Sequence, residues 1–149
     1  MNSRAIMGKN GKSKAIVVDI DGTLADMRGV RGPFEWDKVG DDKPHEDIIE
    51  LVQMYNQKGY FVIVVSGRDA CCKKATKIWL QTHNVPFHNL YMRPLGDVRR
   101  DALVKFELYN SWIEPYWDVH LVIDDRQQTV DMWREYAELR CLQVAPGNF

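Results

Sequence analysis

The segment IVVDIDGTL at residues 16–24 constrains the fold and the chemistry of this chain more than any other. A short apolar run ends abruptly in Asp19 and Asp21, with a glycine and a threonine behind them. Two residues of a strand advance about 6.5–7 Å and point to one side, so both carboxylates leave the strand end together. Carboxylates this close repel each other unless a cation lies between them, so the pair predicts a Mg²⁺ site. One carboxylate can then attack as a nucleophile while the other transfers protons. The alternative is a strand closed by an Asp-Gly turn, where turn geometry alone favours both residue types.

Continuous apolar runs alternate with segments of helical periodicity along the chain. Strands are expected over 15–20, 60–65, 85–91, 119–123 and 139–144. Helices are expected from about residue 48 to a cap at Gly59, over 69–82 and over 126–138. A further helix before residue 115 is indicated by one apolar face, formed by Val98, Ala102, Phe106, Tyr109 and Ile113. Strands that alternate with helices form a parallel sheet covered on both faces. We therefore predict an α/β fold, a Rossmann-like three-layer sandwich with a central, mostly parallel five-stranded sheet.

Length and composition indicate one folded domain. The 149 residues suffice for a single core, and the net charge of −1 gives no general attraction to nucleic acid or anionic membranes. Residues 1–13 are basic and hold no acid, so we expect a flexible arm at 1–13 and the folded domain at 14–149. No apolar run approaches the roughly 20 residues of a membrane span, so we expect no membrane association. The three cysteines show no spacing typical of disulfides, which predicts a cytoplasmic protein.

Three of the predicted strands end in residues that suit phosphoryl chemistry. These ends are Asp19-Ile-Asp21, Ser66-Gly-Arg68 and Asp124-Asp-Arg126. The second and third also fit an ordinary turn and a helix cap when each is taken alone. Parallel strands, however, bring their carboxyl ends to one edge of the sheet, where ligands bind. Acids for a divalent cation beside donors for an anion are the components of a phosphoryl-transfer site.

Asp101 and Lys105 add a cation to this set, because they are spaced i, i+4 on the helix that follows the third strand. One interpretation is an exposed helical ion pair, which is worth a few tenths of a kcal/mol. The other is a lysine directed into the site, where several acids and a phosphate need more positive charge than one Mg²⁺ carries. The spacing itself fits both interpretations.

The full set of motifs resembles a known family of enzymes. Asp19-x-Asp21, Ser66, Lys105 and Asp124-Asp125, in this order, resemble the four motifs of the haloacid dehalogenase (HAD) superfamily of phosphohydrolases. Longer segments are similar to the phosphatase domains of T-even phage polynucleotide kinase/3′-phosphatases. These segments are 19–25, Arg31-Gly-Pro33, 64–68, 96–105, 123–126, Met132-Trp-Arg134 and 143–149.

The resemblance implies a Mg²⁺-dependent phosphatase that forms an aspartyl-phosphate intermediate. Asp19 would be the nucleophile, Asp21 the general acid and base, and Lys105 a neutralising cation held in place by Asp101. The implied Mg²⁺ ligands are Asp19, the backbone carbonyl of Asp21, Asp124 and, directly or through water, Asp125. Contacts to the substrate phosphate are expected from Thr23, Arg31, Ser66, Gly67, Arg68 and Arg93.

The closer resemblance implies removal of the 3′-terminal phosphate from DNA or RNA ends during nucleic-acid repair, in the cytoplasm of a host if the chain is phage-encoded. Lids of the superfamily are inserted after the first or third strand. The gaps here, 22–44 and about 92–96, leave room for a flap and not for a large cap domain. The kinase half of the phage enzymes has no counterpart, since Gly8–Ser13 lacks P-loop spacing, so a kinase or ligase would be a separate partner. DNA or RNA preference and oligomeric state stay open.

Two other functions fit the same sequence. One is a HAD phosphatase for a small phosphomonoester or nucleotide, and the other is a non-catalytic binder of nucleic-acid ends. Phe34 and Trp36 could stack on a base or pack the flap onto the domain. Lys73, Lys74 and Lys77 could contact flanking phosphates or form a solvated helix face.

Overall fold

The computed structural model describes residues 5–149 of the chain. Its centre is a five-stranded sheet in the order β5-β4-β1-β6-β7, in which every neighbouring pair of strands is parallel. These strands are β1 (Ser13–Val18), β4 (Phe61–Asp69), β5 (Asn89–Arg93), β6 (Trp117–Asp124) and β7 (Cys141–Gln143). The helices are α1 (Glu46–Lys58), α2 (Lys73–Thr82), α3 (Asp101–Trp112) and α4 (Gln127–Asp131). None of the helices in the described part of the chain is long and apolar enough to cross a membrane.

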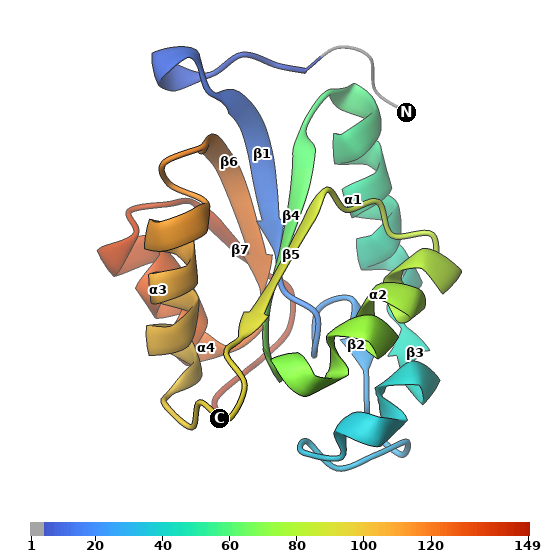
Figure 1. Ribbon diagram of the computed structural model, residues 1–149. Coiled ribbons are helices and arrows are strands. Elements are labelled where there is room, and N and C mark those ends of the chain that lie inside the picture. The colour runs from blue at the N-terminus through green and yellow to red at the C-terminus, as the bar shows by residue number, and fades with distance from the viewer. Residues whose placement is uncertain (1–4) are drawn as a thin grey trace.

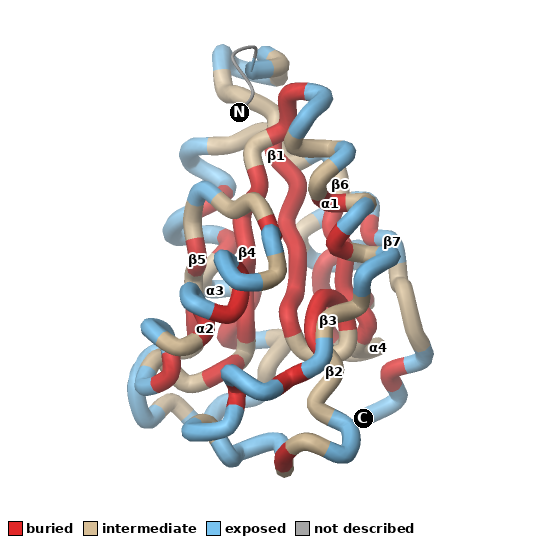
Figure 2. Tube along the Cα trace, turned by 90° about the vertical axis from the view of Figure 1, so that its right-hand side faces the viewer, coloured by how far each residue is buried: buried red, intermediate tan, exposed pale blue. Residues whose placement is uncertain are grey.

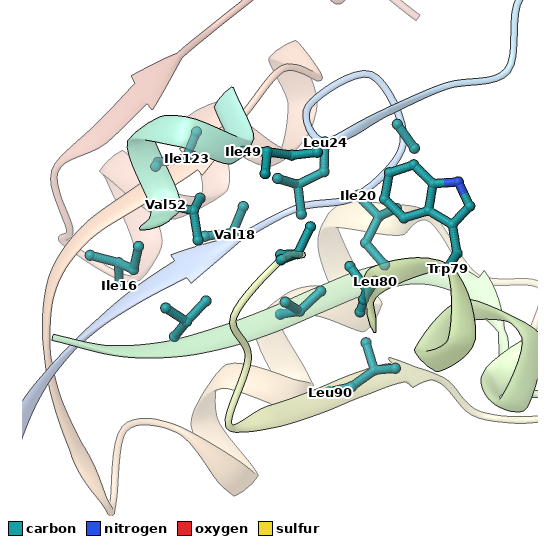
Figure 3. Packing of buried hydrophobic residues seen from close by; sticks show 14 of the residues in the cluster. Ile16, Val18, Ile20, Leu24, Ile49, Val52, Trp79, Leu80, Leu90 and Ile123 are labelled. Atoms are coloured by element: carbon teal, nitrogen blue, oxygen red, sulfur yellow. The ribbon is translucent and has the colours of Figure 1, made fainter. Parts of the chain in front are cut away.

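Helices cover both faces of the sheet because alternate residues of its strands point to opposite sides. On one face, Ile16 and Val18 of β1 belong to a buried cluster with Ile49 and Val52 of α1 and Trp79 of α2 (Figure 3). Burying each such side chain stabilises the fold by about 1.5–3 kcal/mol. This face therefore holds α1 and α2 against the sheet (Figure 1).

The opposite face carries the other half of the core. Ala15 and Val17 of β1 pack in a second cluster with Tyr109 of α3, with Ile113 just after that helix and with Trp133. Strands β1 and β4 are consequently buried along most of their length, and the exposed segments are the outer helix faces and the loops (Figure 2). The predicted three-layer α/β sandwich with a parallel five-stranded sheet is confirmed.

Helix α1 ends where its sequence predicts. The backbone at Gly59 has φ +129°, a conformation that side chains rarely adopt, and its N–H bonds to the last turn of the helix. The backbone N–H of Tyr60, the next residue, donates to the Tyr55 carbonyl, and β4 begins directly after it. Periodicity and a terminal glycine were thus sufficient to define this element.

Other elements differ from the prediction at their ends. Val98 lies in the loop before α3 and is 95% exposed, so its assignment to the buried helix face is wrong. The helix expected over 126–138 is a short α4 followed by one π-helical turn, Met132–Tyr136. Such wide turns are frequent at functional sites, and this one carries the buried Trp133. β5 begins at Asn89 and not at residue 85.

The flap, residues 22–44, lies at the carboxyl-end edge of the sheet between β1 and α1 (Figure 1). Two short strands, β2 (Ala25–Asp26) and β3 (Lys43–Pro44), pair in antiparallel fashion and close its base. A 3₁₀ helix at Trp36–Asp41 packs against α2. The flap is therefore a compact loop, and residues 5–149 contain no large cap domain, as predicted.

The amino-terminal segment is described from Ala5 onward, and Arg4 lies outside the described residues. Met7 forms an antiparallel bridge with Ser13, at the start of β1. The Lys9 backbone N–H donates to the Asp118 carboxylate at 2.9 Å, and the Lys12 ammonium donates to the Glu114 carbonyl at 2.8 Å. The described part of the expected arm thus makes hydrogen bonds to the domain, at the end of the sheet opposite the flap (Figure 1).

Candidate active site

Lys105 reaches from α3 into the edge of the sheet where β1 and β6 end. Its ammonium donates to Asp19 at 2.7 Å and to Asp124 at 3.2 Å, and lies 3.7 Å from Asp101. The whole residue is 1% exposed. An exposed helical ion pair is therefore excluded, and the lysine is a buried cation among three carboxylates.

Three buried acids form a cluster beside this lysine. Asp19, Asp124 and Asp125 each offer a carboxylate oxygen, and these oxygens lie within 4.8 Å of one another. The Thr23 hydroxyl donates to Asp19 at 3.0 Å and lies 3.4 Å from Asp125. The Trp133 indole N–H donates to Asp124 at 3.0 Å. Fixed donors on the protein side thus orient the carboxylates toward a common point.

Burial and mutual repulsion dominate the electrostatics of the cluster. Burial, followed by the Asp124 charge, raises the pKa of Asp19 well above its usual range, and burial also raises the pKa of Asp125. Burial opposes the charged form of Lys105, but Asp124 and Asp19 outweigh it and raise the pKa of the ammonium. One lysine therefore does not neutralise the acids that surround it.

These residues fit a hard divalent cation. Mg²⁺ prefers oxygen ligands and is bound in proteins through one or two carboxylates, with water and substrate oxygens completing the shell. The cluster supplies only oxygen donors, already converging within 4.8 Å, and carries an excess of negative charge that a cation would relieve. Asp19, Asp124 and Asp125 are the side chains that could hold the ion.

Asp21 takes no part in that cluster, since its side chain meets two arginines instead. Arg68 donates to both of its carboxylate oxygens, at 2.8 Å and 3.0 Å, and Arg31 donates to one of them at 3.1 Å. Behind Asp21, both guanidinium groups also bind Asp42. The side chains of Arg31, Arg68 and Asp42 are fully buried, while that of Asp21 is 25% exposed.

The end of β4 packs closely against the start of α3, where Gly67 lies next to the Asp101 side chain. The Ser66 hydroxyl accepts the Arg68 backbone N–H at 3.1 Å. Arg93 donates to the Gly67 carbonyl at 2.7 Å and to Asp101 at 3.2 Å. A Cβ atom on Gly67 would overlap the Asp101 carboxylate, so glycine is required for this approach.

A cleft of about 690 Å³ opens above these groups. Asp19, Asp21, Lys105 and Asp125 lie among its lining residues. The flap contributes Phe34 to its lining, and the 96–101 segment, Arg126 and Phe149 contribute further lining residues. Phe34, Val98 and Phe149 are 81%, 95% and 67% exposed, and together with the exposed Arg99 and Arg100 they form the open lip of the cleft.

The structure brings most of the predicted site residues together. Asp19, Asp21, Thr23, Ser66, Gly67, Asp101, Lys105, Asp124 and Asp125 all lie at the same edge of the sheet. Thr23, Arg31 and Arg68, expected on the substrate phosphate, here have protein carboxylates as partners. Lys73, Lys74 and Lys77 are exposed on α2 and lie outside the described lining of the cleft.

Three residues of the site were not predicted from the sequence. Asp42 is one acid of an Asp41-Asp42 pair in the flap, and nothing in its local pattern distinguishes it from its neighbour. Trp133 lies in a segment that carries the resemblance, but its indole contact depends on the π-helical turn. Arg126 directly follows Asp124 and Asp125, and this position is the only feature of the sequence that indicates a place in the site.

Comparisons with known proteins give matches over most of this chain. The profile of the polynucleotide kinase PNKP phosphatase domain matches residues 13–149. A relative from Autographa californica nuclear polyhedrosis virus, provisionally named a bifunctional polynucleotide kinase/RNA ligase, is 31% identical over 125 residues. The match covers 82% of this chain and 18% of the viral protein.

Solved structures show the same architecture. A chain of a Pnkp1/Rnl/Hen1 complex superposes with a TM-score of 0.91 at 33% identity, over 100% of this chain and 51% of that chain. A chain of the Pnkp1/Rnl/Hen1 RNA repair complex also superposes with a TM-score of 0.91 at 33% identity, over 97% of this chain and 46% of that chain. The class C acid phosphatase of Bacillus anthracis, at 22% identity and a TM-score of 0.57, shares the fold over 81% of this chain and 55% of its own. This chain spans about half the length of the first two structures and less than a fifth of the viral relative.

Proposed function

Because this chain belongs to the family of polynucleotide kinase PNKP phosphatase domains, we propose that it removes the 3′-terminal phosphate from nucleic-acid ends with Mg²⁺ as its cofactor. The family and the HAD-like fold that the motifs predicted are confirmed. The observation that carries the proposal is the buried lysine between Asp19 and Asp124, which lines a cleft that Asp21 also lines.

In the first proposed step, a carboxylate oxygen of Asp19 attacks the phosphorus. The bond between phosphorus and the 3′ oxygen breaks, and its electron pair stays on that oxygen, which takes a proton from Asp21. The products are a free 3′-hydroxyl and an aspartyl phosphate on Asp19. Lys105 and the Ser66–Arg68 segment stabilise the negative charge on the transferring group.

In the second proposed step, the Asp21 carboxylate takes a proton from a water molecule as that water attacks the phosphorus. The phosphorus–Asp19 bond breaks, its electron pair returns to the carboxylate, and inorganic phosphate leaves. Asp21 is then protonated again for the next cycle. Mg²⁺ held by Asp19, Asp124, Asp125 and the Asp21 backbone carbonyl would supply positive charge for the phosphate oxygens.

The open lip supports a polymeric substrate. A site without a cap domain lets one end of a long chain enter while the remainder stays in solvent. Phe34 and Phe149 both line the cleft with exposed rings, and the Arg126 guanidinium lies 5.0 Å over the Phe149 ring. Exposed rings with neighbouring arginines suit single-stranded nucleic acid, whose bases stack without sequence preference.

The names of the relatives favour RNA over DNA as the substrate and suggest a kinase and a ligase as partners. One matched structure is an RNA repair complex, and the viral relative is named for both a polynucleotide kinase and an RNA ligase. We therefore propose that the chain acts on RNA or DNA 3′ ends in end repair, together with a kinase and a ligase.

The test is phosphate release from three substrates: a 3′-phosphorylated oligonucleotide, its 5′-phosphorylated counterpart and a small phosphomonoester. We expect Mg²⁺-dependent release from the first, and loss of release in excess EDTA. Asp19→Asn should be inactive yet folded, whereas Asp37→Asn, which changes an exposed acid of the flap, should match the wild type. Residual activity above about one hundredth would reject covalent catalysis by Asp19, since losing a nucleophile costs more than about 3 kcal/mol.

The same assay separates the two alternative functions. Equal or faster release from the small phosphomonoester would identify a phosphatase for small substrates. Tight binding of the oligonucleotide without release from any substrate would identify a non-catalytic binder of nucleic-acid ends.

A further inference from the structure

A second hollow of about 490 Å³ lies on the surface beside the cleft. It opens between α3 and α4, which pack side by side (Figure 1), and we call it the α3–α4 hollow. Its lining comes from three segments: Ala102, Leu103 and Phe106 of α3, Asp131 of α4, and Met132 and Tyr136 of the π-helical turn. None of these residues takes part in the proposed reaction, so the α3–α4 hollow needs an explanation of its own.

The α3–α4 hollow is largely apolar and presents two aromatic rings. Met132 is buried, whereas Leu103 and Tyr136 are exposed. The Phe106 and Tyr136 rings lie 6.3 Å apart and are tilted by 59°. The Ala137 backbone N–H donates to the Met132 carbonyl at 3.0 Å and closes the turn that carries Tyr136. Aromatic rings held in this way form a platform on which a nucleic-acid base can stack.

The α3–α4 hollow is continuous with the cleft, because Arg100 and Gln128 line both. The Gln128 side chain is held at this boundary from two sides. Its oxygen accepts the Ala102 backbone N–H at 3.3 Å, and its nitrogen donates to the Phe149 carbonyl at 3.4 Å. A ligand that fills the cleft can therefore extend across Arg100 and Gln128 into the α3–α4 hollow.

Helix α3 places the α3–α4 hollow beside the reacting groups. Asp101 and Lys105 line the cleft, and the residues that follow each of them, Ala102 and Phe106, line the α3–α4 hollow. Successive residues of an α-helix are about 1.5 Å apart along its axis and about 100° apart around it. The lysine that binds the proposed nucleophile and the ring that lines the α3–α4 hollow thus lie on adjacent faces of one helix.

Charges at this boundary separate a position for a phosphate from a position for a base. Arg100 is exposed, and no ion pair among residues 5–149 includes it, whereas Arg93 and Arg99 nearby bind carboxylates. The Arg100 guanidinium can therefore bind a phosphodiester. In the α3–α4 hollow, the Asp131 carboxylate accepts the Gln127 amide at 2.8 Å and repels a phosphate.

We propose that the α3–α4 hollow is a base-binding subsite for single-stranded nucleic acid, an inference that rests on the proposed phosphatase function. With the 3′-phosphate in the cleft, the phosphodiester on the 5′ side of the terminal nucleoside lies on Arg100. The base of the preceding nucleotide stacks on Tyr136. Because every base has a π face, this subsite selects for chain length and not for sequence.

The test compares a mononucleoside 3′-phosphate, a dinucleotide that ends in a 3′-phosphate, and the same dinucleotide without the base of its first nucleotide. Phosphate release gives kcat/KM for each substrate. The measured quantity is the ratio of kcat/KM for each dinucleotide to that for the mononucleoside. Damage to the reacting groups changes both values together and leaves this ratio as it is. In the wild type we expect a ratio of about 10 or more for the intact dinucleotide, and a lower ratio for the abasic one.

Tyr136→Ala should lower the ratio for the intact dinucleotide by about 10-fold, the effect of one lost stacking contact, and should not change the ratio for the abasic one. Tyr136→Phe keeps the ring and should keep both ratios. Arg100→Gln should lower both ratios by about 2- to 5-fold, as for other exposed ion pairs, because the phosphodiester is common to both dinucleotides. The matched controls are Tyr116→Ala and Arg140→Gln, which change an exposed tyrosine and an exposed arginine outside the lining of the cleft and of the α3–α4 hollow.

Unchanged ratios in both Tyr136→Ala and Arg100→Gln would overturn the proposal and would identify the α3–α4 hollow as a contact surface for a protein. An equal fall of both ratios in Tyr136→Ala would overturn it as well, because the lost contact would not be with the base. A wild-type ratio of 1 with active enzyme would refute the subsite and leave the phosphatase chemistry standing. A wild-type chain that hydrolyses none of the three substrates would refute the proposed function, and the subsite would fall with it.

Discussion

Lys105 is a cation on the buried side of α3, with its ammonium 2.7 Å from Asp19 and 3.2 Å from Asp124. A lysine in this position normally loses its proton because burial disfavours the charge, but these carboxylates raise its pKa and keep it charged. The ammonium is therefore held in its charged form beside Asp19, as the proposed role of Lys105 requires.

Lys105→Met should lower phosphate release by at least about 100-fold, because a preorganised cation at the reacting group is lost. The free energy of unfolding should also fall, by about 3–5 kcal/mol, since Asp19 and Asp124 lose their buried partner. Both are measured on one preparation, by phosphate assay and thermal melting. Lys77→Met, on the exposed face of α2, is the control and should change neither quantity. An active, stable Lys105→Met chain would contradict the proposed role.

At the scale of elements, the contact between the end of β4 and the start of α3 determines where Asp101 lies. The pairing of β4 with β5 shifts register between Ser66 and Asp69, and Gly67 lies inside this irregularity. Arg93 at the end of β5 joins the two elements, since it binds the Gly67 carbonyl and the Asp101 carboxylate.

Gly67→Ala should displace Asp101 and thereby disturb the support of Lys105. The clash is with a side-chain carboxylate, which can move, so we expect a larger loss of activity than of stability. Gly40→Ala is the matched control, because a Cβ atom there has no neighbour within 4 Å. Kinetics and thermal melting of the two variants make the comparison. Equal activity in the two variants would show that the close approach at Gly67 is not needed.

At the scale of the whole molecule, the open cleft predicts a substrate that extends beyond the reacting phosphate. Hydrolysis of a 3′-phosphate should become more efficient over the first few nucleotides of length. KM should rise with salt, with a slope of roughly 0.7 per single-strand phosphate engaged. Phe34→Ala should weaken the dependence on length and leave hydrolysis of a small phosphomonoester unchanged, because the ring lies at the lip and is 81% exposed.

Leu95→Ala is the control for Phe34→Ala, since Leu95 is also exposed but lies outside the cleft lining. A mononucleoside 3′-phosphate processed as efficiently as a longer oligomer, with a KM indifferent to salt, would contradict a polymeric substrate.

The order of strands and helices, and the residues at the strand ends, could be predicted from the sequence alone. Continuous apolar runs and helical spacing are properties of neighbours along the chain, and they identified the strands that place Asp19, Ser66 and Asp124. Parallel strands must bring these ends to one edge, so the candidate site followed from the order of elements. The same reasoning failed for Val98, whose spacing fits the α3 face although the helix begins only at Asp101.

The partners of the charged side chains were decided only by the tertiary structure. The i, i+4 spacing of Asp101 and Lys105 is the same in an exposed pair and in a buried site, and burial alone distinguishes them. Arg31 and Arg68 could bind a substrate phosphate or a protein carboxylate by their chemistry. Their contacts with Asp42 arise because the flap folds back over α2 and the end of β4. Local periodicity determines elements, whereas a charged group's partner depends on packing between segments that are distant in sequence.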